Sequence, residues 1–231
     1  MIDWTHFVAL IPLALLGGVL GLDVVSFPQA MISRPLVAAT LAGGLMGQAP
    51  SGMLIGAALE LIALETLPFG ASRYPEWGSA SVVGGAIFAT HPAHPAGAMT
   101  LGMLAALATT WIGGWTMVKL RQLNAVWAAR WRDGLEAGSR GTVTTLQLTG
   151  MTADLARGVL LTGIAYSLLA PLANACIAVW SMDARLSRAL VVTTAASVAG
   201  GAAWKLFHST AGARWFFVGG LAIGLFVLFA Q

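Results

Sequence analysis

Long stretches without a charged side chain are the feature that most restricts the fold of this chain. The run from Trp77 to Val118 contains no Asp, Glu, Lys or Arg. A helix needs roughly 20 apolar residues to cross a bilayer, so this run is long enough for two crossings with a break at Pro92 and Pro95. The pattern predicts several membrane segments. Further charge-free runs cover residues 7–22, 35–59, 158–182, 189–204 and 215–231.

The composition points to lipid as the main solvent. Only 9% of the residues are charged and 58% are hydrophobic, whereas soluble domains contain roughly 25% charged residues. Several apolar runs are short or interrupted by Gly and Pro, and interrupted helices line the substrate site in many transporters. The alternative is that Gly serves only close helix packing. The sequence therefore predicts an all-α fold: a polytopic integral membrane bundle with broken or re-entrant helices.

Several functional classes are disfavoured. A single cysteine, Cys176, allows neither a disulfide framework nor a cysteine-based metal site. The net charge of +3 is too small to indicate nucleic-acid binding. The first residues contain no Lys or Arg, which argues against a cleaved signal peptide. No phosphate loop, G-x-S-x-G or H-E-x-x-H motif is present. We expect no catalytic residue, no cofactor and no metal site in this chain.

The stretch from Lys119 to Arg140 is rich in basic residues. By the positive-inside rule it should be cytoplasmic. Trp127 and Trp131 are four apart, which favours an amphipathic helix at the membrane interface, with a solvated linker as the alternative. The stretch divides the chain into a membrane half at 1–118, a basic linker at 119–141 and a second membrane half at 142–231.

The two halves share a short similarity. Residues 33–40 and 187–194 match at five of eight aligned positions, and both copies continue into Gly-containing apolar runs. Internal repeats, often inverted, underlie many transporters. We expect an inverted repeat of two halves, against the alternative of a chance match in a biased composition.

The richest group of ionisable residues lies between residues 60 and 76. Glu60 follows an apolar segment, and ionisable residues inside membrane segments usually mark a functional site. Glu65 lies about 140° further around a helix, so both carboxylates need not serve one site. Such a carboxylate could accept hydrogen bonds from sugar hydroxyls, bind a cation or carry a proton. The alternative is a structural ion pair of Glu60 with Arg34 or Arg73.

Two further polar groups interrupt apolar runs. Asp23 and Gln29 flank Pro28 after the first run and form a second candidate site, although Asp23 could instead cap a short helix. His91 and His94 have a spacing that suggests a metal, but no acidic residue nearby completes a ligand set. We interpret them as part of a loop, with an intramembrane hydrolase as a remote alternative.

Three consecutive segments resemble a known family. They are S-R-P-L-V-A-A-T-L-A-G-G-L-M-G at 33–47, G-M-L-I-G-A-A-L-E-L-I-A-L at 52–64 and L-P-F-G-A-S-R-Y-P-E at 67–76. This pattern resembles the IIC component of the mannose/sorbose family of the bacterial phosphoenolpyruvate-dependent sugar phosphotransferase system. The resemblance is strong over residues 23–83 and weaker after the basic stretch.

The resemblance implies a multi-pass permease subunit of the bacterial inner membrane. Such a subunit works in an oligomer with a second membrane subunit, IID, while cytoplasmic IIA and IIB proteins relay a phosphoryl group to the incoming sugar. The phosphorylated histidine is on IIB, so no histidine of this chain need be catalytic. Pro68 and Glu65 depart from the mannose-type pattern, which leaves a hexose-type sugar as the expected substrate class.

The motifs assign candidate residues by position. Glu60 matches the glutamate of the family's L-E-[LM] motif, Arg34-Pro35 match its R-P pair, and Glu76 matches the acidic residue of its P-[DE] pair. Alternatives are a secondary transporter that works without phosphorylation and a regulatory subunit without transport activity. The predicted substrate-binding residues are Asp23, Gln29, Glu60, Glu65, Gly70, Ala71, Arg73 and Glu76.

Overall fold

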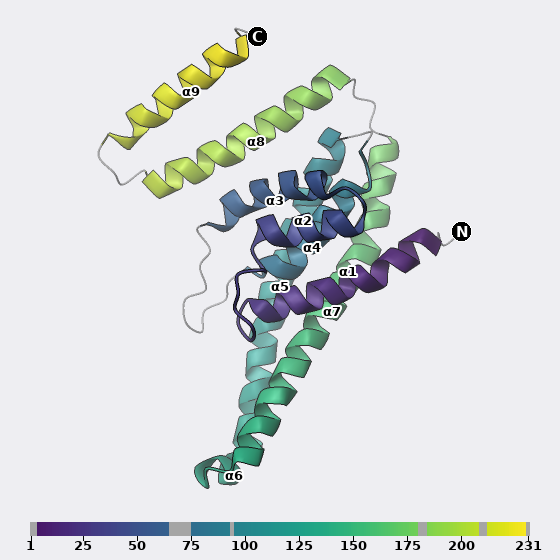
Figure 1. Cartoon of the computed structure of the whole chain (residues 1–231), viewed down its shortest axis with the longest axis vertical. Helices are drawn as coiled ribbons and strands as arrows, with labels where there is room; N and C mark the ends of the chain where they lie inside the picture. Colours follow the sequence, from purple (N-terminus) through teal and green to yellow (C-terminus); the bar gives the residue numbers. More distant parts are fainter. Residues whose placement is uncertain (1–3, 65–74, 93–94, 180–183, 208–211, 230–231) are drawn as a thin grey trace.

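The computed structural model describes residues 4–64, 75–92, 95–179, 184–207 and 212–229, and within them the secondary structure is helical (Figure 1). The all-α prediction is confirmed. Most of these helices coincide with the charge-free runs. A segment surrounded by lipid or by other helices has no water to bond its backbone N–H and C=O groups, and a helix pairs these groups with one another. The helices are α1 (Trp4–Asp23), α2 (Pro35–Leu45), α3 (Ala49–Ala63), α4 (Trp77–Ala89), α5 (Pro95–Arg130), α6 (Arg132–Glu136), α7 (Arg140–Ala178), α8 (Ala184–Phe207) and α9 (Ala213–Phe229).

Three helices are too short to cross a bilayer on their own. Helices α2, α3 and α4 have 11, 15 and 13 residues, which corresponds to about 16–23 Å against a hydrocarbon core of about 30 Å. The chain reverses between α2 and α3 at Gly47, whose φ of +74° favours glycine. Every residue of α4 is buried. Short interrupted helices are therefore present, as the sequence indicated.

The α2–α3 hairpin depends on glycine at its closest approach. A Cβ atom on Gly52 would lie 2.2 Å from the carbonyl oxygen of Ala39, and one on Gly43 would lie 2.7 Å from the Cα atom of Gly52. Both obstacles are backbone atoms, so they cannot move aside as a flexible side chain could. The two backbones touch where neither residue has a side chain.

Substituting Gly52→Ala should therefore lower the free energy of unfolding by about 1–3 kcal/mol, since the added methyl group separates the two backbones. Gly44→Ala is the matched control. A Cβ atom there would only contact the Cβ of Ala49 at 3.9 Å, so the better helix propensity of Ala should stabilise the protein by up to about 1 kcal/mol. Denaturant titration of both variants in detergent measures the difference, and equal effects would refute the close approach.

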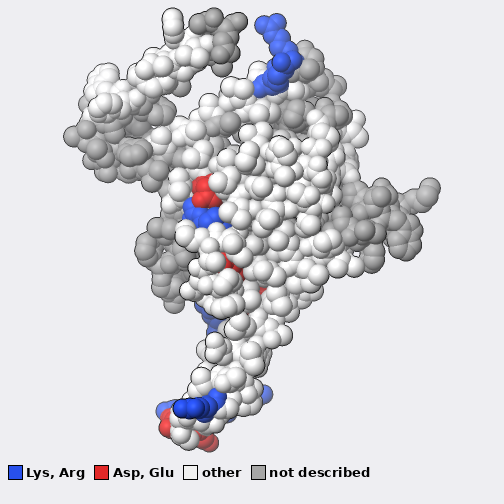
Figure 2. All heavy atoms as spheres, viewed as in Figure 1, with Lys and Arg blue, Asp and Glu red and all other residues white. Residues whose placement is uncertain are grey.

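Helices α5 and α7 extend far beyond the short helices. They contain 36 and 39 residues, or about 54 and 58 Å at 1.5 Å per residue. By length and composition the segments Gly97–Arg130 and Arg140–Ala178 could each cross a membrane. Their distal halves project together from the body, and α6 joins them at the tip (Figure 1). Charged side chains gather at this tip (Figure 2).

The basic stretch has a different local structure from the one expected. Residues 119–140 contain the end of α5, all of α6 and the start of α7, so they form the distal part of a helical hairpin rather than a separate interfacial helix. The regular helix breaks at Trp131, between α5 and α6. The helix α5 does not end where the charges begin, because Lys119, Arg121 and the residues after them favour a helix and include no Gly or Pro before Arg130. A cytoplasmic location stays a prediction.

Helix α4 lies at the centre of the body. It contacts α1, α2, α3, α5 and α7, while α1 packs along α7. Helix α8 contacts α3 and α5, and α9 contacts α8. The two similar segments, residues 33–40 and 187–194, both lie at the start of a helix, α2 and α8. The inverted repeat itself stays a prediction.

Candidate functional site

Asp23 organises the loop between α1 and α2. Its side chain is buried, and its two carboxylate oxygens accept hydrogen bonds from the backbone N–H groups of Ala30 at 2.7 Å and Ser33 at 2.9 Å. Ala30 lies between Gln29 and Met31, which have φ values of +59° and +61°. Backbone N–H groups that converge on one carboxylate hold this turn in place. Gln29 is exposed and donates from its amide to the carbonyl oxygen of Val25 at 2.7 Å.

Glu60 forms an ion pair with Arg34. The two residues lie at the adjacent ends of the α2–α3 hairpin, and Nε of Arg34 donates to Oε1 of Glu60 at 2.6 Å while Nη2 contacts the same oxygen. The second oxygen accepts from the backbone N–H of Leu36 at 3.2 Å. The Arg34 and Glu60 side chains are 24% and 21% exposed. The structure thus contains the ion pair considered as an alternative, and a substrate role for Glu60 stays a prediction.

Glu76 is fully buried at the start of α4. Its Oε1 atom accepts a hydrogen bond from the backbone N–H of Ser79 at 3.1 Å, so Glu76 is the N-cap of the central helix. Hydrogen bonds with Thr110 of α5 fix its backbone on both sides. Among the described residues, its Oε2 atom has no hydrogen-bond partner. The family motif predicted Glu76 as a substrate-binding residue, which stays a prediction, but it did not predict the burial of this side chain at the start of α4.

Asp154 and Arg157 of α7 form a buried ion pair. Nε of Arg157 donates to Oδ1 of Asp154 at 2.9 Å, and their side chains are 8% and 2% exposed. Ser26 donates to the second oxygen of Asp154 at 2.6 Å, and Arg157 also reaches Thr116 of α5 at 3.4 Å. The spacing of three places both residues on one face of α7, and Ser26 and Thr116 bring two further parts of the chain to the pair.

Glu76 and this ion pair belong to one group, called here the buried charge cluster (Glu76, Asp154 and Arg157). A Cβ atom on Gly21 would lie 3.4 Å from Nη2 of Arg157 and 3.6 Å from Oε1 of Glu76, so both side chains surround the same small space. A Cβ atom on Gly113 would lie 3.1 Å from Oε2 of Glu76. Glycines on α1 and α5 leave room for the charges. Ionisable groups buried in a membrane protein are costly, and they commonly mark functional sites.

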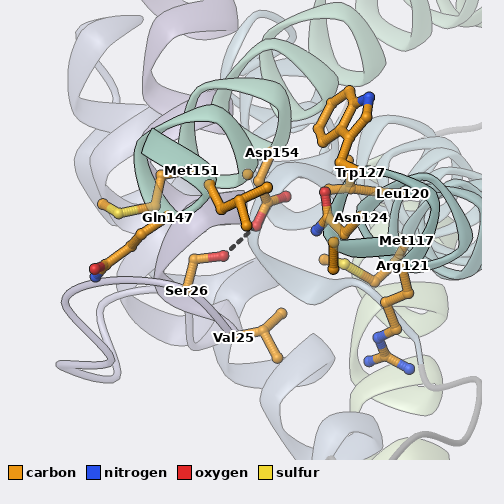
Figure 3. A pocket seen from close by; sticks show the side chains of 13 residues that line it. Val25, Ser26, Met117, Leu120, Arg121, Asn124, Trp127, Gln147, Met151 and Asp154 are labelled. Atoms are coloured by element: carbon orange, nitrogen blue, oxygen red, sulfur yellow. Dashed lines mark hydrogen bonds between the residues drawn. The ribbon is translucent and has the colours of Figure 1, made fainter. Parts of the chain in front are cut away.

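A cleft of about 400 Å³ lies between the distal halves of α5 and α7, next to the loop after α1 (Figure 3). Asp154 lies at the edge of the buried charge cluster and also lines this cleft. Sequence reasoning did not find the cleft, because its walls come from three separate segments. It is lined by Val25, Ser26, Met117, Leu120, Arg121, Asn124, Trp127, Ala128, Leu146, Gln147, Gly150, Met151 and Asp154.

Other predicted residues fall elsewhere. His91 is half-buried, and its Nδ1 lies 3.0 Å from both the hydroxyl of Thr90 and the carbonyl oxygen of Ile87, so these local groups surround it. The structure thus brings together Glu60 with Arg34 and Glu76 with the Asp154–Arg157 pair, whereas Gln29 lies on the surface. The predicted residues Glu65, Gly70, Ala71 and Arg73, together with His94, lie outside the described residues.

Interrupted helices and buried ionisable side chains are common at the functional sites of membrane transporters. The model of the family described as "PTS system sorbose-specific iic component" matches residues 7–227. The chain therefore belongs to this family of membrane components of the sugar phosphotransferase system, and the resemblance seen in the sequence is confirmed.

Solved structures show the same fold. One, titled "Structure of membrane protein", has a TM-score of 0.66 at 18% identity, covering 97% of this chain and 88% of that one. Another, the mannose transporter ManYZ in complex with microcin E492, has a TM-score of 0.59 at 19% identity, covering 96% and 87%. At this identity the likeness supports the fold alone. Comparison with curated protein sequences gave no match.

Proposed function

We propose that this chain is the IIC permease subunit of a mannose-type phosphotransferase system, which binds a hexose-type sugar and moves it across the membrane as it is phosphorylated. The observation that carries the proposal is the family match from residue 7 to residue 227, which spans nearly the whole chain. The buried charge cluster supports it, because a chain with so little charge gathers three ionisable side chains at one place in its interior.

The proposed sugar site contains Glu60, Asp23, Gln29 and the segment 65–76. Ionised carboxylates suit sugars because each oxygen accepts strong hydrogen bonds from hydroxyl groups. Each neutral hydrogen bond contributes about 0.5–1.5 kcal/mol net, and a handful of them supports micromolar binding. The exposed part of the Arg34–Glu60 pair is available to a hydroxyl group without breaking the ion pair.

The proposed assembly contains a IID membrane subunit and cytoplasmic IIB and IIA proteins. In this proposal the protein is a multi-pass component of a bacterial inner membrane. The hairpin of α5 and α7 carries its basic tip into the cytoplasm, where phosphorylated IIB docks. The three parts at 1–118, 119–141 and 142–231 are then a membrane half, a cytoplasmic tip and a second membrane half.

An uptake screen with labelled hexoses and amino sugars tests the proposal. Cells should express this chain with its IID, IIB and IIA partners, in the presence and absence of the general phosphocarrier protein. We expect uptake of at least one sugar, and we expect that uptake to disappear without the phosphocarrier. Uptake that persists without it would identify a secondary transporter, and a complex that binds no sugar would identify a regulatory subunit.

A further inference from the structure

The turn between α1 and α2, residues 24–33, is built around one buried carboxylate. Both oxygens of Asp23 accept backbone N–H groups of the turn, Oδ1 from Ala30 at 2.7 Å and Oδ2 from Ser33 at 2.9 Å. Asp23 is only 2% exposed, so a dissolved ligand can hardly reach it. A sugar hydroxyl would also have to displace a backbone group. Asp23 is therefore placed to hold the turn rather than to bind a ligand.

The turn has an unfavourable backbone conformation. Gln29 and Met31 have φ values of +59° and +61°, a region that residues with a side chain rarely adopt. A further bond holds the turn from outside, where the hydroxyl of Ser26 donates to Asp154 of α7 at 2.6 Å (Figure 3). The turn persists because the hydrogen bonds to Asp23 and to Asp154 offset the unfavourable backbone conformation.

The turn ends at the ion pair of the proposed sugar site. The backbone N–H of Arg34 donates to the carbonyl oxygen of Met31 at 3.2 Å. The preceding N–H, of Ser33, is one of the two that Asp23 accepts. Arg34 is the N-cap residue of α2, and its guanidinium group binds Glu60 of α3. A shift of the turn therefore moves Arg34 relative to Glu60.

We propose that Asp23 is a positioning residue of the sugar site. It holds the turn so that Arg34 meets Glu60, and Glu60 rather than Asp23 accepts hydrogen bonds from the sugar. The inference rests on the proposed function and gives the two carboxylates of the proposed site different roles. When the turn is released, the guanidinium group no longer orients Glu60, so the affinity for sugar falls although the substituted residue does not touch sugar.

Chemical labelling of a thiol in the turn tests whether Asp23 holds it. Ser33→Cys, made together with Cys176→Ser, gives the chain a single thiol at a position that is 9% exposed, and it keeps the backbone N–H that bonds to Asp23. The complex with its IID partner is treated with a small maleimide. Adding Asp23→Asn should speed labelling at least about tenfold, because the amide nitrogen of Asn cannot accept a hydrogen bond and one backbone N–H loses its partner.

Asp23→Ser also keeps a single acceptor and should act in the same direction, so the test does not depend on the folding of one variant. Thr40→Val is the matched control, since its hydroxyl donates to the carbonyl oxygen of Leu36 at 2.6 Å within α2 and not to the turn. It should leave labelling at position 33 within about twofold of the background rate. Equal labelling rates in the Asp23 variants and in Thr40→Val would overturn the role of Asp23 in the turn.

A double-variant comparison of uptake tests whether the turn acts through Glu60. Asp23→Asn alone should lower uptake about tenfold at low sugar concentration and much less at a saturating one, because it weakens binding. Combined with Glu60→Gln, it should lower uptake no further than Glu60→Gln does alone, since the effects of residues that act through one another do not add. Thr40→Val should leave uptake unchanged, alone and in the combination.

Two results of this comparison would overturn the inference. Losses that multiply in the double variant would identify Asp23 as a separate sugar ligand, and normal uptake despite faster labelling would show that the turn does not act on the site. The failure of the proposed function is a different result. Uptake that persists without the phosphocarrier would refute that function, while the labelling and the double-variant comparison would still decide the role of Asp23.

Discussion

Replacing Arg157 by Leu is expected to lower the free energy of unfolding by about 3–5 kcal/mol, because the substitution leaves the carboxylate of Asp154 buried without its guanidinium partner. The pair is almost completely buried, so water cannot replace the lost contact. The hydrogen bond from Arg157 to Thr116 of α5 is lost as well. Chemical denaturation in a mild detergent, followed by circular dichroism, measures the change.

The tip of the hairpin offers a matched control for this variant. Arg132 pairs with Glu136 across one helical turn, and their side chains are 76% and 63% exposed. Removing an exposed pair costs about 0–1 kcal/mol, so Arg132→Leu should be nearly neutral. The double variant Asp154→Leu with Arg157→Leu should recover part of the stability, since no unpaired charge remains. Equal effects of Arg157→Leu and Arg132→Leu would contradict the burial of the pair.

The substitution Glu60→Gln is expected to reduce sugar uptake by about tenfold to a hundredfold while the protein still inserts into the membrane. Gln keeps the size of the side chain but loses the charge, and a hydrogen bond to a charged group is worth about 1.5–3 kcal/mol. Glu60 is partly exposed, so the ion pair with Arg34 contributes little to stability. Initial rates of uptake, divided by the amount of protein in the membrane fraction, give the comparison.

Thr152→Val on α7 is the control for that measurement, because it removes an exposed hydroxyl that donates to the carbonyl oxygen of Leu148 in the same helix, outside the proposed site and the tip. Its uptake should equal that of the unmodified protein. Normal uptake by Glu60→Gln would exclude Glu60 from the sugar site and leave only its structural role beside Arg34.

Charge-free runs predicted the helical architecture, but they did not predict where helices begin and end. The run from Trp77 to Val118 was correctly divided into two helices near Pro92 and Pro95, since proline cannot continue the helix before it. Helix α4 has only 13 residues, because it begins where Glu76 caps it. Helix α5 continues past Lys119 to Arg130. A charged residue ends an apolar run, but it does not end a helix when the residues after it also favour helix formation.

The candidate site was less predictable, for a physical reason. The Arg34–Glu60 pair was among the alternatives, and its two residues stand at the two ends of one charge-free run, 35–59. The importance of Asp154 and Arg157 could not be read from their spacing of three, since that spacing is the same on an exposed helix. Their burial depends on glycines of other helices, such as Gly21 and Gly113, and such distant contacts leave no local pattern.

The most direct test of the central claim, that this chain passes sugar inward in step with its phosphorylation, is a product assay in sealed vesicles. The complex with its IID partner is reconstituted with phosphorylated IIB enclosed, and a labelled hexose from the uptake screen is added outside. The account predicts that labelled sugar phosphate accumulates inside, one molecule for each phosphoryl group that IIB loses. Accumulation of free sugar at the same rate with unphosphorylated IIB would contradict it.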